Sequence, residues 1–97
     1  NIYNVLSADV TEKYYAQLYT NGYSSYSKGD YLTAIDNLLK VVTKDPAYKD
    51  GDASYYLAQA YRKNNDLESA RPYYQYVIDN YPGTARARTS KNYVKLQ

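Results

Sequence analysis

Apolar residues recur along this chain at helical spacing, on two faces that lie 36 residues apart. The first face holds Ala34, Leu38, Val41 and Val42. The second holds Ala70, Tyr74, Val77 and Ile78. A proline, Pro46 or Pro82, follows each face where the helix must already have ended, because proline disrupts a helix interior. The pattern therefore predicts two equivalent helices.

The same 36-residue step relates the segments that precede these two helices. Small residues align, Gly22 with Ala58, and so do two polar turns, Lys28-Gly29-Asp30 and Asn64-Asn65-Asp66. The closing aspartate of each turn suits the N-cap of the following helix, and the paired asparagines can adopt the left-handed backbone that ends the preceding one. Each unit is therefore expected to be a pair of antiparallel helices.

Capping and spacing signals predict further helices. The first expected helix, with Ser7 or Asp9 as its N-cap, carries Val10, Tyr14, Leu18 and Tyr19. After an inter-unit loop over residues 47–52, Gly51-Asp52 is expected to start the next helix. Thr84 is the expected N-cap of a last helix that carries Ala87, Ser90, Tyr93, Val94 and Leu96.

These elements predict one all-α domain over residues 1–97, with about five helices stacked as antiparallel hairpins. A lone helical hairpin cannot bury its apolar face, whereas stacked neighbours can. The first unit covers residues 10–46 and the second 47–82. The helix within residues 83–97 is expected either to cap the stack or to begin a further unit.

Tyrosine is the aromatic residue of this chain: it occurs 16 times, and Phe, Trp, Met and Cys are absent. The core must take its aromatic volume from tyrosine, whose hydroxyl needs water or a partner, so thin helical layers suit the composition. Core positions are expected for Tyr14, Tyr61 and Tyr74. For Tyr19, Tyr23 and Tyr55, core packing and a role in binding both stay open.

A net charge of +2 is too small to indicate a nucleic-acid binder. No apolar run approaches the ~20 residues of a membrane span. Four cations and no acid follow Gly83, namely Arg86, Arg88, Lys91 and Lys95. They favour a solvated basic end of the domain, and we expect neither a nucleic-acid partner nor a membrane span within the chain.

Catalytic chemistry is not indicated. The absence of His and Cys removes the commonest general base and the best nucleophile, and the four glycines form no phosphate-binding loop. Asp45, Asp50 and Asp52 cluster near the inter-unit loop but lack the glycine and closing glutamate of a calcium loop. The sequence therefore predicts no catalytic residue, no metal and no cofactor, and the chain is not expected to be an enzyme.

These features resemble the tetratricopeptide repeat, whose unit has a small residue, an aromatic, a turn with Gly and Asp or Asn, an alanine, an aromatic and a terminal proline. The second unit matches with Ala58, Tyr61, Asp66-Leu67, Ala70, Tyr74 and Pro82. The first unit matches with Gly22, Gly29-Asp30-Tyr31, Ala34 and Pro46, but has Ser25 and Leu38 where aromatics are usual. The resemblance spans residues 10–96 and implies a short right-handed solenoid.

The resemblance also implies a non-catalytic protein-interaction module, in which the first helices of successive hairpins line a concave groove for a peptide or protein segment. Carried over position by position, the groove candidates are Tyr19, Tyr23, Tyr26, Tyr55, Gln59, Arg62 and Lys63. If the 36-residue step continues, the last helix adds a basic end of Arg88, Lys91 and Lys95. Such a groove suits a partner with aromatic or proline-rich residues and acidic groups. The family's carboxylate clamp is not expected, because Tyr19, Tyr23 and Tyr56 stand at its positions.

Residues 73–84 are similar to the bacterial cell-envelope branch of the family, which includes outer-membrane assembly lipoproteins and the Tol–Pal-associated cell-division coordinator. This similarity implies an extracytoplasmic location, with the cytoplasm as the alternative. The alternative function is a structural spacer or self-association domain of a larger envelope protein, with Val94 and Leu96 packing on a second copy. A third alternative is a polyanion-binding surface of tyrosines and cations, against which the low net charge argues.

Overall fold

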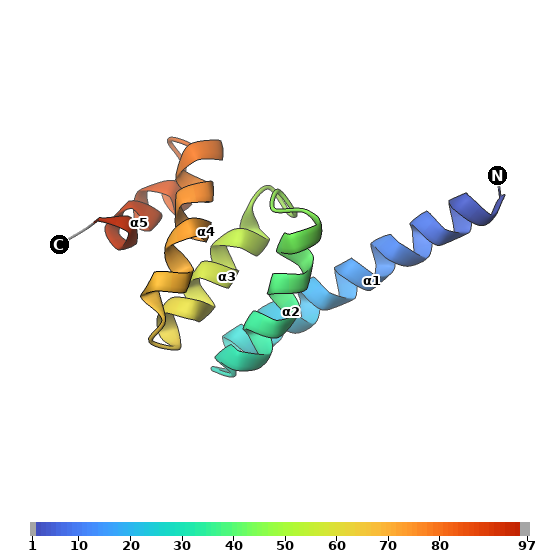
Figure 1. Cartoon of the computed structure of the whole chain (residues 1–97), viewed down its shortest axis with the longest axis horizontal. Coiled ribbons are helices and arrows are strands. Elements are labelled where there is room, and N and C mark those ends of the chain that lie inside the picture. Colours follow the sequence, from blue (N-terminus) through green and yellow to red (C-terminus); the bar gives the residue numbers. More distant parts are fainter. Residues whose placement is uncertain (1, 96–97) are drawn as a thin grey trace.

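The computed structural model describes the backbone of residues 2–95 and the side chains of residues 10–95. Five helices make up this range: α1 (Ile2–Ser27), α2 (Tyr31–Lys44), α3 (Asp52–Lys63), α4 (Leu67–Asn80) and α5 (Ala85–Val94). Figure 1 shows α1 with α2 and α3 with α4 as two neighbouring hairpins, and α5 packs against α4. The described range holds no strand, so the predicted all-α stack of hairpins is confirmed.

Both hairpin turns have the capping that their residues predict. The side chains of Asp30 and Asp66 accept the backbone N–H three residues later, at 3.3 Å and 3.1 Å. Asn65 takes the left-handed backbone, with a φ of 63°, whereas Asn64 has a φ of −90°. The two N-caps are therefore confirmed, and the left-handed turn is made by the second asparagine.

The loop between the hairpins depends on Gly51. Its φ is 87°, and a Cβ at this position would collide with the ring of Tyr81. Helix α3 begins at the next residue, as predicted, while Pro46 and Pro82 lie beyond the ends of α2 and α4. The chain thus turns where its glycine and prolines predict.

The core is largely aliphatic and forms two clusters. The larger one joins α1, α2 and α3 through Leu18, Ala34, Leu38, Val41, Val42, Ala53, Leu57 and Ala60. The smaller one joins α3 and α4 through Ala58, Ala70 and Tyr74. Gly22 lets α1 and α2 approach closely, because a Cβ there would lie 2.6 Å from Cγ of Leu38. The two predicted apolar faces are buried, with Ile78 half-buried at their edge.

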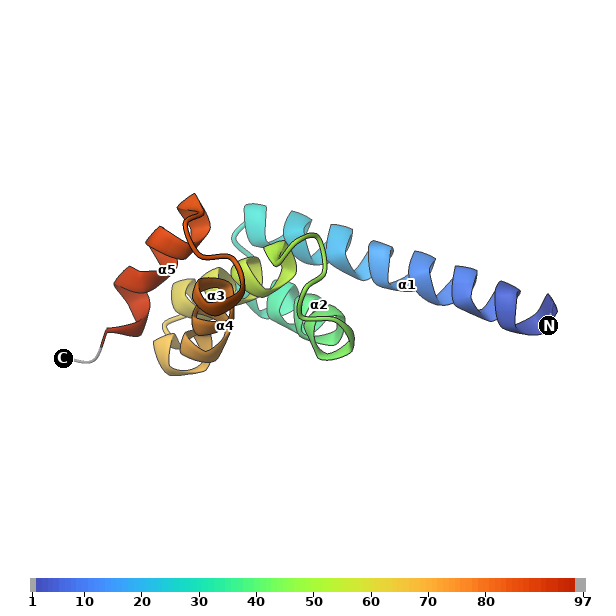
Figure 2. The ribbon, with the colours of Figure 1, turned by 90° about the horizontal axis from the view of Figure 1, so that it is seen from above.

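Helix α1 is longer than predicted and reaches well beyond its hairpin partner (Figures 1 and 2). It begins at Ile2 instead of Val10, so Ser7 and Asp9 lie inside the helix and the predicted N-cap is wrong. At 26 residues against 14 for α2, its N-terminal part runs past the end of α2. Val10 is 64% exposed. Tyr14 is 53% exposed at the edge of the α1–α2 contact, beside Leu39 and Thr43, so the core position predicted for it is wrong.

The symmetry of the repeat breaks along one stripe of α1. The α3 residues that join the larger core cluster are Ala53, Leu57 and Ala60. Their equivalents 36 residues earlier in α1 are Gln17, Asn21 and Ser24. Gln17 and Asn21 are exposed and hydrogen-bond to each other, Nε2 to Oδ1, at 2.9 Å. A stripe that is apolar in the second unit is therefore polar in the first, as solvation requires.

Helix α5 departs from the 36-residue step. It begins at Ala85, 33 residues after Asp52. The step is shorter because the connection from α4 to α5 covers only residues 81–84, whereas the connection from α2 to α3 covers residues 45–51. Thr84 caps it as predicted, since Oγ1 accepts the N–H of Ala87 at 3.1 Å. Its packing residues are Ala87, Ser90, Tyr93 and Val94. The predicted fifth, Leu96, lies outside the described residues.

Candidate functional site

Tyrosines of α1 and α3 meet along one side of the stack. The ring centroid of Tyr56 in α3 lies 4.9 Å from that of Tyr23 and 5.4 Å from that of Tyr26, both in α1. Tyr55 lies edge-on to Tyr56 at 5.4 Å, and Tyr19 precedes Tyr23 by one helical turn. We call these five residues the tyrosine face.

Helical spacing explains why Tyr19, Tyr23 and Tyr26 share a side of α1, because residues three or four apart are neighbours on a helix. Tyr55 joins the face through its edge-on contact with Tyr56. Tyr23 is 43% exposed, and the other four members of the face are half-buried. Helix α5 and the C-terminal end of α1 lie on the same side of the α3–α4 hairpin (Figure 2). The face is therefore a continuous aromatic surface over α1 and α3, which α5 borders.

Cations lie over the rings of this surface. Lys63 Nζ is 5.2 Å from the ring centroid of Tyr26, and Lys49 Nζ is 6.0 Å from that of Tyr19. The guanidinium of Arg86 in α5 lies 5.3 Å from the ring centroid of Tyr55, and its Nη2 donates to the hydroxyl of Tyr56 at 3.1 Å. Such cation–π contacts hold a positive charge at the surface of the ring.

Arg62 belongs to a buried network behind the face. Its Nε donates to the hydroxyl of Tyr74 at 2.9 Å, and its Nη2 donates to Oε1 of Gln59 at 3.2 Å. The Tyr74 hydroxyl donates to the same Gln59 oxygen, and Gln59 Nε2 donates to the hydroxyl of Tyr26 at 3.5 Å. The guanidinium also covers the ring of Tyr93 at 4.3 Å. The network thus links α1, α3, α4 and α5.

Burial changes the acidity of two tyrosines. Burial raises the pKa of Tyr74 to about 12, although the hydrogen bond from Arg62 acts in the opposite direction. Burial, and then the negative charge of Asp52, raises the pKa of Tyr19 to about 12. Both side chains therefore carry a proton at neutral pH and act as hydrogen-bonding phenols.

One end of the face is electrically balanced. A hollow of about 380 Å³ opens beside it, and its lining includes Lys49, Asp50, Asp52 and Arg86. Arg86 Nη1 lies 3.3 Å from Oδ1 of Asp52 in an ion pair. Two acids therefore accompany the two cations at this end.

The structure gathers most of the groove candidates. Those that belong to the face or its network are Tyr19, Tyr23, Tyr26, Tyr55, Gln59, Arg62 and Lys63. The candidates in the last helix, Arg88, Lys91 and Lys95, are exposed, and Arg88 Nη1 donates to the carbonyl of Gly83 at 3.1 Å. Because α5 begins three residues early, Arg88 and not Lys91 stands at the position equivalent to Tyr55.

Sequence reasoning missed three members of the site. Tyr56 and Arg86 contact each other on the face, and Tyr93 supports Arg62 from behind. The sequence holds a signal for Arg86: Thr84, the cap of α5, follows Pro82 by two residues, whereas Gly51 follows Pro46 by five. Counting from the caps would have placed α5 correctly.

The described residues form neither a metal-binding cluster of acidic side chains nor a helix that could span a membrane. Among those residues, no three acidic side chains gather as a metal site would need. Nor does any described helix have the length and apolar character that crossing a membrane takes. What the face offers is aromatic surface with cations over it.

Comparison with known proteins gives one match. A family model described as tetratricopeptide repeat matches residues 19–85, which is more than half of the chain. The matched range includes the whole tyrosine face and both hairpin turns. No curated protein and no solved structure matches the chain.

Proposed function

The chain belongs to the tetratricopeptide repeat family, whose repeats generally mediate protein–protein interaction, and we propose that its tyrosine face binds a segment of a partner protein. The family is in general a non-catalytic one. The tyrosine face lies on α1 and α3, the first helices of the two hairpins. A ligand segment lying across it would contact both repeats.

The observation that carries this proposal is that the tyrosine face covers the core without entering it, since Tyr19, Tyr26, Tyr55 and Tyr56 pack against the core clusters but are only partly buried. The buried interior is made by aliphatic side chains such as Leu38, Val41 and Leu57, with Tyr74 as the one fully buried ring among the described residues. The face tyrosines instead keep part of each ring at the surface. Tyrosine is enriched at binding surfaces because it offers large contact area with few rotatable bonds.

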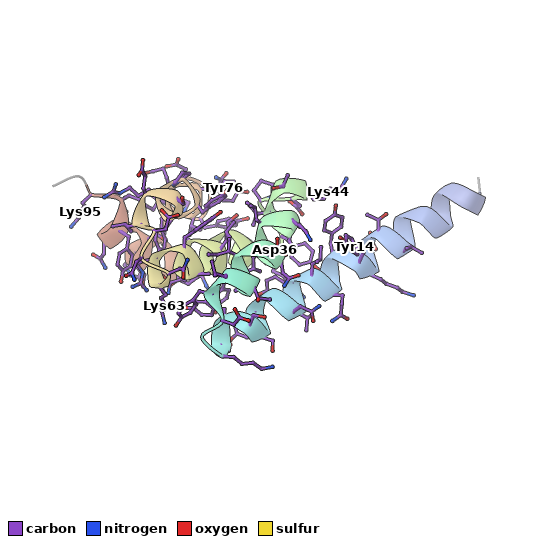
Figure 3. All side chains as sticks on the ribbon, turned by 60° about the horizontal axis from the view of Figure 1, so that its bottom comes forward. Tyr14, Asp36, Lys44, Lys63, Tyr76 and Lys95 are labelled. Atoms are coloured by element: carbon purple, nitrogen blue, oxygen red, sulfur yellow. The ribbon has the colours of Figure 1, made fainter. Side chains whose placement is uncertain are left out.

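The first experiment is affinity capture from a bacterial envelope extract with wild type and Tyr23→Ala. Tyr23 is exposed, so the variant should keep its fold, which circular dichroism checks. Tyr14→Ala is the matched control, because Tyr14 is about as exposed but lies beside Leu39 and Thr43 of α2, outside the tyrosine face (Figure 3). A partner captured by wild type and by Tyr14→Ala, and lost by Tyr23→Ala, supports the proposal. Equal capture by all three proteins would move binding off the tyrosine face.

Self-association, or a spacer role, is the second candidate function. It is favoured by Val10 and Tyr14, two exposed apolar side chains in the N-terminal half of α1. Val94 is a weaker contributor than the sequence predicts, because it packs half-buried against the smaller core cluster. Sedimentation over a range of concentrations tests this candidate, since a mass that stays monomeric throughout would eliminate self-association.

For location, we propose the bacterial cell envelope, on the strength of the sequence similarity over residues 73–84. An antibody to the domain would test it in the source organism by fractionation. Recovery with the extracytoplasmic fraction is expected. Recovery with the cytoplasmic fraction would contradict the proposal.

A further inference from the structure

Four hydrogen-bond donors gather where the C-terminal ends of α1 and α3 meet. They are Tyr26, Gln59, Arg62 and Lys63, which we call the donor corner. Lys63 lies over the ring of Tyr26, and Gln59 Nε2 approaches the hydroxyl of the same tyrosine. Figure 3 shows Lys63 at the rim of the molecule, where its side chain is exposed.

The acceptors of this corner are used up inside the protein. Oε1 of Gln59 accepts from both Tyr74 and Arg62, so the amide is oriented with its nitrogen toward α1. The Tyr74 hydroxyl accepts from Arg62. Besides the Tyr26 hydroxyl, which accepts from the Gln59 amide, the remaining polar groups of the corner are N–H donors, namely the second Gln59 amide hydrogen, the Lys63 ammonium and the remaining guanidinium hydrogens.

The positive charge of the corner has no carboxylate partner. Arg62 is half-buried and is held by a phenol, an amide and an aromatic ring, and within the described residues no acid reaches it or Lys63 at ion-pair distance. Both cations lie in the last turn of α3, where they also interact favourably with the helix dipole. The helix dipole alone would not fix the orientation of the Gln59 amide, which the hydrogen bonds from Arg62 and Tyr74 do.

The contrast with the other end of the tyrosine face indicates where an anion would bind. There, Asp50 and Asp52 accompany Lys49 and Arg86 in one hollow, so the charge is balanced. At the donor corner it is not. A carboxylate suits a guanidinium with nearby N–H donors, because charge-assisted hydrogen bonds are about twice as strong as neutral ones.

We propose that the donor corner binds an aspartate or glutamate side chain of the partner segment, so that the tyrosine face selects acidic segments. This inference rests on the proposed function of the face. A side chain is the source, not a chain terminus, because the residues beyond Lys63, Asn64 and Asn65, are exposed and leave room for a bound segment to continue past the corner. The segment crosses the tyrosines and places its acid at Arg62 and Lys63.

The test begins with random peptides of about a dozen residues, which span about 40 Å when fully extended. They are displayed on phage and fused to the coat protein through their C-termini, so that no peptide has a free carboxyl terminus. Selection on the immobilised wild-type domain should enrich Asp and Glu over the starting library. A selected sequence is then synthesised in two forms, with an amidated and with a free C-terminus, and its Kd is measured by fluorescence anisotropy. The two forms should bind equally.

Variants of equal charge change isolate the corner. Lys63→Gln should weaken binding of the amidated peptide by about tenfold, and Lys63→Arg should restore it. Lys44→Gln, which removes the same charge from an exposed residue at the C-terminal end of α2, should change Kd by less than about twofold. Lys63 is exposed, so neither of its substitutions should disturb the fold.

The outcomes separate this inference from the proposal beneath it. Peptides that are enriched without acids, or that lose equal affinity in Lys63→Gln and Lys44→Gln, would overturn the acidic-segment inference and leave peptide binding intact. Binding confined to the free-carboxyl form would overturn the side-chain source. Failure to enrich any peptide, with wild type and Tyr23→Ala alike, would count against the proposed function itself.

Discussion

The hydroxyl of Tyr74 joins side chains of different helices although its ring is fully buried. A buried phenol without partners would cost free energy, and here Arg62 and Gln59 supply them. In a chain that lacks Phe and Trp, this is how an aromatic ring can occupy the core. The residue therefore contributes both volume and a polar connection.

Replacing Tyr74 by Phe separates these two contributions. The ring volume stays, but Arg62 and Gln59 lose their shared partner inside the protein, so we expect the free energy of unfolding to fall by about 1–2 kcal/mol. Urea denaturation measures it. Tyr73→Phe is the control, since the Tyr73 ring is half-buried and stacks on Tyr61 at 6.0 Å. Equal losses in the two variants would show that the Tyr74 hydroxyl adds nothing to stability.

Alkaline pH should destabilise the domain through the ionisation of its tyrosines. Tyrosine in an unfolded chain ionises near pH 10, whereas burial raises the pKa of Tyr74 and of Tyr19 to about 12. Above about pH 10 the unfolded chain releases protons that the folded chain retains, so the stability present below that pH is lost progressively up to about pH 12. The urea midpoint should therefore decline from about pH 9 to about pH 11. A constant midpoint over this range would show that these hydroxyls ionise freely in the folded state.

At the scale of the helices, the interior boundaries follow from local chemistry and the outer ones do not. Asp30, Asp66 and Thr84 each accept the predicted capping hydrogen bond, because an N-cap requires one side chain and the three residues after it. At the start of α1 the cap-type residues Ser7 and Asp9 are misleading, because they lie inside the helix. Spacing alone could not show where the helix begins.

The burial of a helical residue depends on neighbours that the helix's own pattern does not reveal. Tyr14 follows the same spacing as Leu18, yet Leu18 is buried, whereas Tyr14 lies exposed at the edge of the α1–α2 contact, beside Leu39 and Thr43. The candidate site shows the same limit. The α1 and α3 candidates came from the family resemblance, position by position, and those in α5 depended on the length of a connection as well.

Two valines of the same hairpin test this account. Val41 in α2 is fully buried, so Val41→Ala should lower the free energy of unfolding by about 2 kcal/mol through lost burial and a residual cavity. Val10 in α1 is mostly exposed, and Val10→Ala should change it by less than about 0.5 kcal/mol. Thermal or urea denaturation of both variants provides the comparison. A large loss in Val10→Ala would mean that the α1 extension packs against something in solution.

On the scale of the whole molecule, the α1 extension makes the domain elongated. Its principal extents are 53 × 28 × 19 Å and its radius of gyration is 14.3 Å, whereas a compact chain of this length has about 12.5 Å. Small-angle X-ray scattering at low concentration should give about 14 Å for the monomer. A value near about 12 Å would mean that α1 folds back, and one that rises with concentration would indicate association.

The polar stripe of Gln17, Asn21 and Ser24 also limits how such a protein can be lengthened, by evolution or by design. A duplicated hairpin inserted ahead of α1 would press its apolar second helix onto side chains that hydrogen-bond to water and to each other. The new unit would not pack against α1 until those three positions were replaced by small or aliphatic residues. Hairpins are therefore added more easily after the second unit than ahead of the first.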